Sequence, residues 1–130
     1  MSSLTQTLIW LDIPVIDLPR AIHFYQQVFD CAVQDHRPAS PTATLKVSGS
    51  SNGFTLFQTP LELPASSGMV PYLNCDNRLE QALSQTRLMG GKVLQNIQKM
   101  EPFGFRAVIL DSEGNRLALH SSSISTKTST

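Results

Sequence analysis

The predicted architecture of this chain follows from one stretch near its start, LIWLDIPVIDLPRAIHFY, residues 8–25. Its first half, residues 8–16, is an apolar segment of strand length. Asp17 follows, and its carboxylate suits the cap of a helix because it accepts a hydrogen bond from the first turn. Pro19 is tolerated in that turn, where the missing N–H would have no helical partner. Apolar residues then recur at helical spacing to residue 29. The stretch predicts a strand followed by a helix.

The same pattern returns at an offset of 60 residues. A strand-like segment at 69–75 precedes a helical pattern over about 78–89, which ends at the helix-stopping pair Gly90 and Gly91. Three strand-like segments follow each helix: 32–37, 43–48 and 53–58, and then 92–98, 106–110 and 116–120. The order β-α-β-β-β therefore occurs twice.

We predict an α+β protein built from two βαβββ modules within one structural domain. The first module spans 1–58 and the second spans 69–121. Residues 59–68 contain two prolines and a Ser-Ser-Gly run, so they are the predicted linker. Residues 122–130 are nearly all Ser and Thr, which is typical of a flexible tail.

Composition excludes several classes of function. The 130 residues carry 10 basic and 10 acidic side chains and are 41% hydrophobic. A chain without excess positive charge is poorly suited to nucleic acid. No apolar run approaches the roughly 20 residues of a membrane span. Cys31 and Cys75 have neither metal-site spacing nor a disulfide framework, so we expect a cytoplasmic protein.

Strand alternation collects polar side chains on one face of each predicted sheet. In the first strand Ile13 and Val15 suit a face packed under helices, while their neighbours suit the opposite face. Such a face is either exposed to solvent or lines a ligand cavity, and aromatic residues with a polar atom favour the cavity. The residues placed on this face are Trp10, Asp12, Tyr72, Asn74, Arg116 and His120.

Two segments resemble the vicinal oxygen chelate superfamily, which includes glyoxalases, extradiol dioxygenases, and fosfomycin- and bleomycin-resistance proteins. Residues 13–25 resemble its opening strand and helix, with Val-x-Asp followed by Arg-Ala and Phe-Tyr at helical spacing. Residues 111–119, DSEGNRLAL, resemble its Asp-Pro-Asp-Gly-Asn turn and last strand. The similarity extends from about residue 8 to residue 121. It implies paired modules whose mixed sheets curl around a cavity with the helices outside, often in a homodimer.

The resemblance also implies a divalent metal held by side chains of the first, fourth, fifth and eighth strands. These positions correspond here to Trp10, Gln58, Val70 and Ala118. Of the four, Gln58 alone offers an atom that can ligate a metal, since indole, isopropyl and methyl groups have no lone pair to give. We therefore predict that the standard metal site is absent and that no cofactor is needed.

Asp12 and His120 each lie two residues from a standard ligand position. This pair has three interpretations: part of a nonstandard divalent-metal site, a catalytic base with its orienting carboxylate, or a structural hydrogen bond. A catalytic zinc site normally has three protein ligands, which counts against the metal.

The leading hypothesis is a protein of the glyoxalase/bleomycin-resistance type that binds an unidentified small molecule without a metal, as a homodimer. Its predicted ligand contacts are Trp10, Gln58, Tyr72, Asn74 and Arg116. The alternative is a lyase, isomerase or dioxygenase of the same superfamily that uses Asp12 and His120 as catalytic residues. A third interpretation is an interaction module without a ligand. No partner among nucleic acids or membranes is expected.

Overall fold

The structure, a computed structural model, describes residues 8–29, 31–46 and 53–124. The chain divides into two compact units, residues 1–64 and residues 65–130. Each unit contains one helix and one four-stranded mixed sheet. The prediction of an α+β protein with two βαβββ modules is confirmed. The curl of the sheets around a common cavity stays a prediction.

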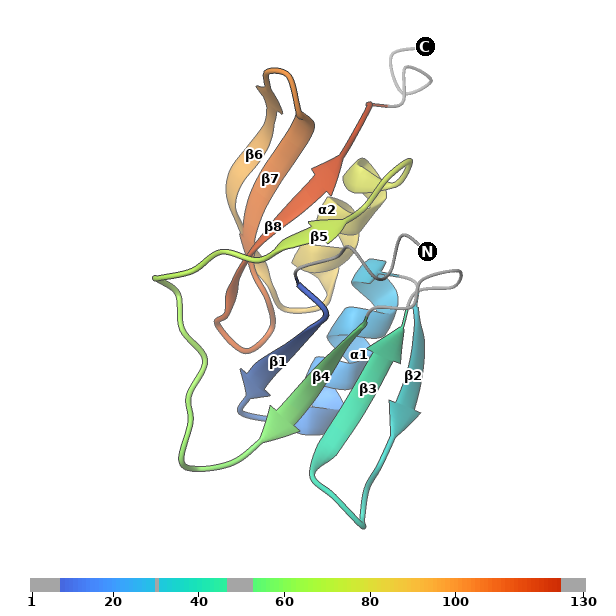
Figure 1. Ribbon diagram of the computed structural model, residues 1–130, viewed down its shortest axis with the longest axis vertical. Coiled ribbons are helices and arrows are strands. Elements are labelled where there is room, and N and C mark those ends of the chain that lie inside the picture. Colours follow the sequence, from blue (N-terminus) through green and yellow to red (C-terminus); the bar gives the residue numbers. More distant parts are fainter. Residues whose placement is uncertain (1–7, 30, 47–52, 125–130) are drawn as a thin grey trace. The chain divides into compact units, whose positions relative to one another are not determined.

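In the first unit the strands run in the order β1-β4-β3-β2 (Figure 1). β1 and β4 are parallel, and the other neighbours are antiparallel. The predicted third strand continues to residue 48, but residues 47 and 48 lie outside the described residues. The elements are β1 (Trp10–Val15), α1 (Leu18–Phe29), β2 (Ala32–Asp35), β3 (Thr42–Lys46) and β4 (Gly53–Gln58).

Helix α1 begins where the sequence predicts. The Asp17 carboxylate accepts a hydrogen bond from the backbone N–H of Arg20 at 3.1 Å, which caps the first turn. The apolar face of the helix is buried, and Phe24 lies on it, whereas Ile22 is only half-buried. Aromatic rings dominate this core: Tyr25 stacks on Phe29 and meets the ring of Phe54 from β4 edge-on.

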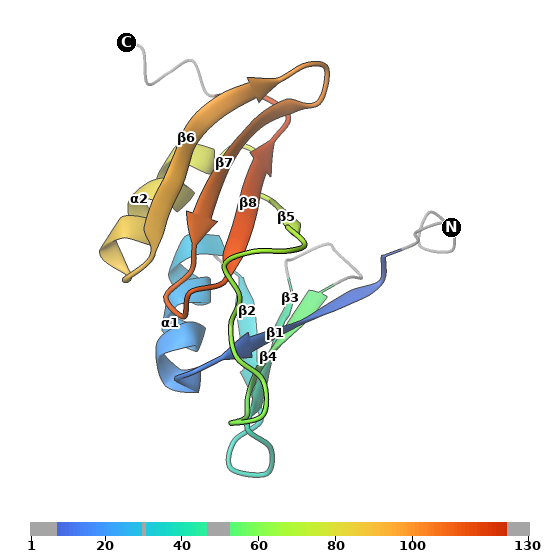
Figure 2. The same ribbon diagram turned by 90° about the vertical axis from the view of Figure 1, so that its left-hand side faces the viewer.

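The second unit has the corresponding strand order, β5-β8-β7-β6, with β5 and β8 parallel (Figure 2). β6 and β7 form a long antiparallel hairpin beside β8. The elements are β5 (Tyr72–Asn74), α2 (Leu79–Leu88), β6 (Lys92–Met100), β7 (Gly104–Leu110) and β8 (Arg116–Ser121).

The glycine pair after α2 ends that helix as predicted. Gly90 has φ 97°, a left-handed conformation that costs a residue without Cβ little. The N–H of Gly91 then reaches back to the carbonyl oxygen of Thr86 at 2.8 Å. This bond satisfies a helix-end carbonyl and turns the chain into β6.

The turn between β7 and β8 is organised by one carboxylate. Asp111 accepts the backbone N–H groups of Glu113 and Asn115, each at 2.8 Å. The side-chain oxygen of Asn115 in turn accepts the N–H of Ala65 at 3.1 Å, and the carbonyl of Ala65 accepts the N–H of Arg116 at 3.1 Å. The entry to the second unit is thereby bound to the start of β8.

Neither described helix has the length and apolar character that crossing a membrane requires. Of the predicted tail, residues 122–124 are described, and residues 125–130 lie outside the described residues.

Candidate functional site

The first sheet carries Trp10 and Asp12 on the face opposite its buried residues. Ile13 and Val15 of the same strand are buried, whereas Trp10 is 36% exposed and Asp12 is exposed. The indole N–H of Trp10 donates a hydrogen bond to the hydroxyl oxygen of Thr55 at 2.9 Å. Thr55 is also the register partner of Asp12. The structure therefore brings Trp10, Asp12 and Thr55 together on what we call the first open face.

Two hydroxyls extend this face across the sheet. Thr44 of β3 is the register partner of Thr55. Its hydroxyl is hydrogen-bonded to Nε2 of His36, just after β2, at 2.9 Å. A row of polar side chains thus runs from Trp10 through Thr55 and Thr44 to His36. The two threonine hydroxyls can each bind a donor or an acceptor of a ligand.

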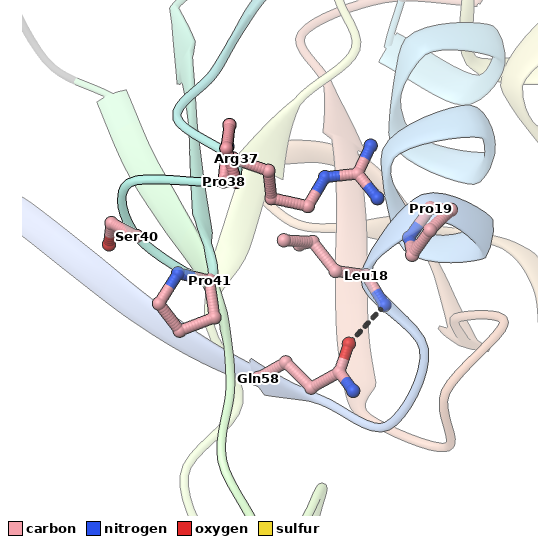
Figure 3. A pocket seen from close by; sticks show the side chains of 7 residues that line it. All are labelled: Leu18, Pro19, Arg37, Pro38, Ser40, Pro41 and Gln58. Atoms are coloured by element: carbon pink, nitrogen blue, oxygen red, sulfur yellow. Dashed lines mark hydrogen bonds between the residues drawn. The ribbon is translucent and has the colours of Figure 1, made fainter.

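Gln58 is on β4, the strand that carries Thr55, but it lies away from Trp10. It is the register partner of Val15, at the opposite end of the β1–β4 pair from Trp10. Its side-chain oxygen accepts the backbone N–H of Leu18 at 2.8 Å, at the start of α1 (Figure 3). The structure does not bring Gln58 together with Trp10, and it gives the amide oxygen a partner.

The strand register explains why Gln58 lies away from Trp10. Asp12 pairs with Thr55, 43 positions later, but Tyr72 pairs with Ala118, 46 positions later. The offset of 60 relates Asp12 to Tyr72, so the pairing makes Thr55 the equivalent of Ala118. The second module has three more residues between its parallel strands than the first module has between β1 and β4. An alignment of the modules at a constant offset of 60 does not show this difference.

The second sheet carries Tyr72, Arg106 and Ala118 on one face, called here the second open face. Tyr72 pairs with Ala118 of β8, and Ala118 pairs with Val108 of β7, two residues after Arg106. Arg106 Nη1 donates a hydrogen bond to the Tyr72 hydroxyl, and its guanidinium carbon lies 5.8 Å from the centre of the Tyr72 ring. The guanidinium reaches Tyr72 across β8, where the methyl group of Ala118 leaves room.

His120 and Asn74 are register partners at the far end of this sheet. The His120 ring is hydrogen-bonded through Nε2 to the carbonyl oxygen of Phe103. A carbonyl only accepts, so Nε2 carries the proton, and Nδ1 is the nitrogen with a lone pair in the neutral ring. The Asn74 side-chain oxygen accepts the N–H of Asp76 at 2.8 Å. Asn74 is therefore partly committed to the turn after β5.

Arg116 and Val70 lie toward the other end of the second sheet. Arg116 Nη2 donates to the carbonyl oxygen of Gly68 at 2.7 Å. Val70 precedes β5 and is half-buried. Tyr72 and Ala118 lie between this end and His120, whereas Arg106 of β7 is the register partner of His120.

The residues at the implied metal-ligand positions do not fit a divalent ion. Trp10, Val70 and Ala118 offer no lone pair, and Thr55, the structural equivalent of Ala118, is a neutral hydroxyl. Gln58 already accepts a backbone hydrogen bond. Among the described residues, no three His, Cys, Asp or Glu side chains are grouped closely enough to hold a metal. Asp12 belongs to the first unit and His120 to the second.

A separate hollow of about 380 Å³ lies in the first unit beside the start of α1 (Figure 3). Arg37 reaches into it but is held by a bidentate ion pair with Asp35, with Arg37 Nη2 2.6 Å from the carboxylate. This pair lowers the pKa of Asp35 to about 2. The charge of Arg37 is therefore already matched. The lining residues are Leu18, Pro19, Arg37, Pro38, Ser40, Pro41 and Gln58.

The cysteines do not form a reactive centre. Cys75 is buried, and burial raises the pKa of its thiol to about 12, so the nucleophilic thiolate is scarce at neutral pH. Cys31 is half-buried, and its thiol donates to the carbonyl of Tyr25 at 3.7 Å. Neither Cys31 nor Cys75 forms a disulfide.

Sequence reasoning missed Arg106, Thr55 and Thr44. Arg106 shares the alternation of Val108 and Leu110 along β7, a signal that places it on one face but does not say what lies beside it. Its contact with Tyr72 depends on the β7-β8-β5 order, which no local pattern contains.

The fold consists of two βαβββ modules, and in each module the first and last strands are parallel. This fold defines the class of protein. The family model of the Glyoxalase/Bleomycin resistance protein/Dioxygenase superfamily matches residues 7–119. The chain belongs to this superfamily, as the sequence resemblance predicts. A comparison with curated proteins gave no match.

Solved structures share the fold at low sequence identity. A glyoxalase/bleomycin resistance protein from Albidiferax ferrireducens T118 has a TM-score of 0.72 at 12% identity, over 89% of this chain and 98% of that one. A glyoxalase/bleomycin resistance protein/dioxygenase family enzyme from Burkholderia phytofirmans PsJN has 0.71 at 14%, over 87% and 96%. The fosfomycin resistance protein FosX from Mesorhizobium loti has 0.68 at 15%, over 96% and 98%. At such identities the likeness establishes the fold alone.

Proposed function

We propose that this chain binds a small molecule on its open sheet faces without the superfamily's standard metal site. The observation that carries the proposal is the chemistry of Trp10, Val70 and Ala118, which cannot ligate a metal, together with the hydroxyl of Thr55 in place of a carboxylate or imidazole. A ligand here is held by aromatic surface and hydrogen bonds.

The open faces have the groups that such binding requires. Trp10 is 36% exposed and Tyr72 is 46% exposed, so each offers an aromatic surface. Asp12 lies beside the first ring, and Asn74, Arg116 and His120 share the sheet of the second. Apolar surface with a few placed polar groups is the usual make-up of a ligand site. Gln58 is the one predicted contact that this proposal leaves out.

Metal loading tests the proposal directly. Purified protein is incubated separately with nickel, zinc, manganese and ferrous ions, passed through a desalting column, and analysed for bound metal. We expect no ion at a stoichiometric level. Stoichiometric retention that disappears in both Asp12→Ala and His120→Ala would refute metal-independent binding. Glu80→Ala, at the exposed start of α2, is the matched control for loss of one surface carboxylate.

Ligand binding is measurable through Trp10, the single tryptophan of the chain. Its indole lies on the first open face, so a bound molecule alters its fluorescence. Fractions of small metabolites are screened by this signal and by thermal shift. Trp10→Phe retains a ring and removes the signal, so in that variant the thermal shift alone reports whether binding persists.

A proton-transfer enzyme is the second candidate. The observation in its favour is His120, whose bond to the Phe103 carbonyl fixes the proton on Nε2 and leaves Nδ1 able to accept another. It predicts turnover of the ligand found above. Product formation that His120→Gln abolishes while binding persists would establish it.

We also propose that the chain forms a homodimer and is located in the cytoplasm. Sedimentation velocity across a concentration range tests the dimer, which predicts a mass of twice 14.3 kDa. Fractionation of expressing cells tests the location.

A further inference from the structure

We propose that Arg106 and Tyr72 form a subsite for the carboxylate of a small organic acid. The inference rests on the proposed function, because it names the class of ligand that the second open face receives. It concerns the second unit alone, since both residues and the strands that carry them lie within residues 65–130.

The geometry holds the guanidinium in place. One terminal nitrogen of Arg106 donates to the Tyr72 hydroxyl, and the cation lies over the ring of the same residue. Ala118 is on β8, which lies between β5 with Tyr72 and β7 with Arg106, and it is fully buried. Because its side chain is a single methyl group, nothing bulky separates the arginine from the tyrosine. A guanidinium fixed at one nitrogen loses little side-chain freedom when it binds an anion with the others.

The charge of Arg106 is not matched within the described chain. No described carboxylate forms an ion pair with it, and its Nε is shielded from solvent without any hydrogen-bond acceptor. Arg37 provides the contrast, since Asp35 binds it through both oxygens. A partly buried guanidinium without an anionic partner is costly, and an anionic oxygen bound at its terminal nitrogens reduces that cost.

The surroundings favour an organic anion. Arg116, on the same sheet, likewise has an unpartnered shielded Nε and no described carboxylate, so the face is positively charged. The exposed Tyr72 ring lies beside Arg106, and His120 is the register partner of Arg106 on β8. A planar carboxylate matches the guanidinium fork, and an apolar body matches the Tyr72 ring.

The test compares a carboxylate with its neutral amide. Benzoate and benzamide are titrated into the full-length protein labelled with 15N, and binding is followed by the Nε–H signals of arginine. Arg106→Lys assigns the Arg106 signal. We expect benzoate to move that signal and to bind about tenfold more tightly than benzamide, because a charged hydrogen-bonded pair is lost with the amide.

Variants separate recognition from folding. Arg106→Lys retains the charge but loses the fork, so we expect about tenfold weaker benzoate binding and unchanged benzamide binding. Arg87→Lys, at the exposed end of α2, is the matched control and leaves both affinities unchanged. Tyr72→Phe keeps the ring and removes the hydroxyl, so benzoate weakens and the Arg106 signal broadens as the guanidinium gains freedom.

The inference would be overturned by the absence of saturable benzoate binding, by equal affinity for benzoate and benzamide, or by benzoate binding that Arg106→Lys does not weaken. Inorganic phosphate is the probe for an anion without an apolar body, and phosphate binding as strong as that of benzoate would refute the assignment to an organic acid. The comparison of the two probes on unmodified protein stands even if a variant fails to fold.

Failure of this inference is distinct from failure of the proposed function. If a neutral ligand binds and changes Trp10 fluorescence while Arg106 plays no part, metal-independent binding stands and the carboxylate subsite falls. If the protein retains a stoichiometric metal through Asp12 and His120, the proposed function falls whatever Arg106 does.

Discussion

The indole N–H of Trp10 and the hydroxyl of Thr55 are joined by a 2.9 Å hydrogen bond across the parallel strands β1 and β4. This bond fixes the aromatic ring over the first open face. A double-mutant cycle of Trp10→Phe and Thr55→Val, measured by urea unfolding, should give a coupling of about 0.5–1.5 kcal/mol. Additive effects of the two changes would show that the bond contributes nothing to stability.

Gln58 is expected to stabilise α1. Its amide oxygen accepts the N–H of Leu18. Gln58→Leu removes that acceptor, and we expect the free energy of unfolding to fall by about 1 kcal/mol, as for the loss of a helix cap. Gln58→Glu keeps an oxygen at the helix start and should be at least as stable as the wild type. A loss of ligand binding without a loss of stability in Gln58→Leu would instead make Gln58 a contact residue.

The Asp35–Arg37 pair predicts a pH dependence at acid pH. The pKa of Asp35 is lowered from 3.8 to about 2 by its hydrogen bonds to Arg37. A carboxyl group with a lowered pKa adds stability that is complete above pH 4 and is lost as pH falls toward 2. We expect a carbon-13 NMR titration to show this low pKa, and Arg37→Gln to return it toward 3.8. An Asp35 that titrates normally in the unmodified protein would contradict the pair.

The two thiols should differ in reactivity. Cys75 is buried with its pKa raised to about 12, so it reacts with iodoacetamide only after unfolding. Cys31 is half-buried and reachable in the folded protein. Mass spectrometry of alkylated peptides measures each site separately, with Cys75→Ser as the control for assignment. Rapid labelling of Cys75 at neutral pH in folded protein would show that the α2 side of the second sheet opens readily.

Local signals were enough to predict the elements. The bounds of β4 agree with the prediction of 53–58, since its apolar run is flanked by turn residues, and Asp17 and Gly90 mark helix ends by their own chemistry. The site depends on strand pairing, which local patterns do not contain. A three-residue difference between the modules separates Gln58 from Trp10, and the β7-β8-β5 order brings Arg106 to Tyr72.

The second unit begins at Ala65, before its first strand, β5. The N–H and carbonyl of Ala65 are both engaged by the β7–β8 turn, through Asn115 and Arg116. A truncated gene that opened at Met69 would discard both bonds and expose the turn that orients β8. Anyone isolating this half for crystallisation or for fusion to another protein should keep the four residues 65–68 attached.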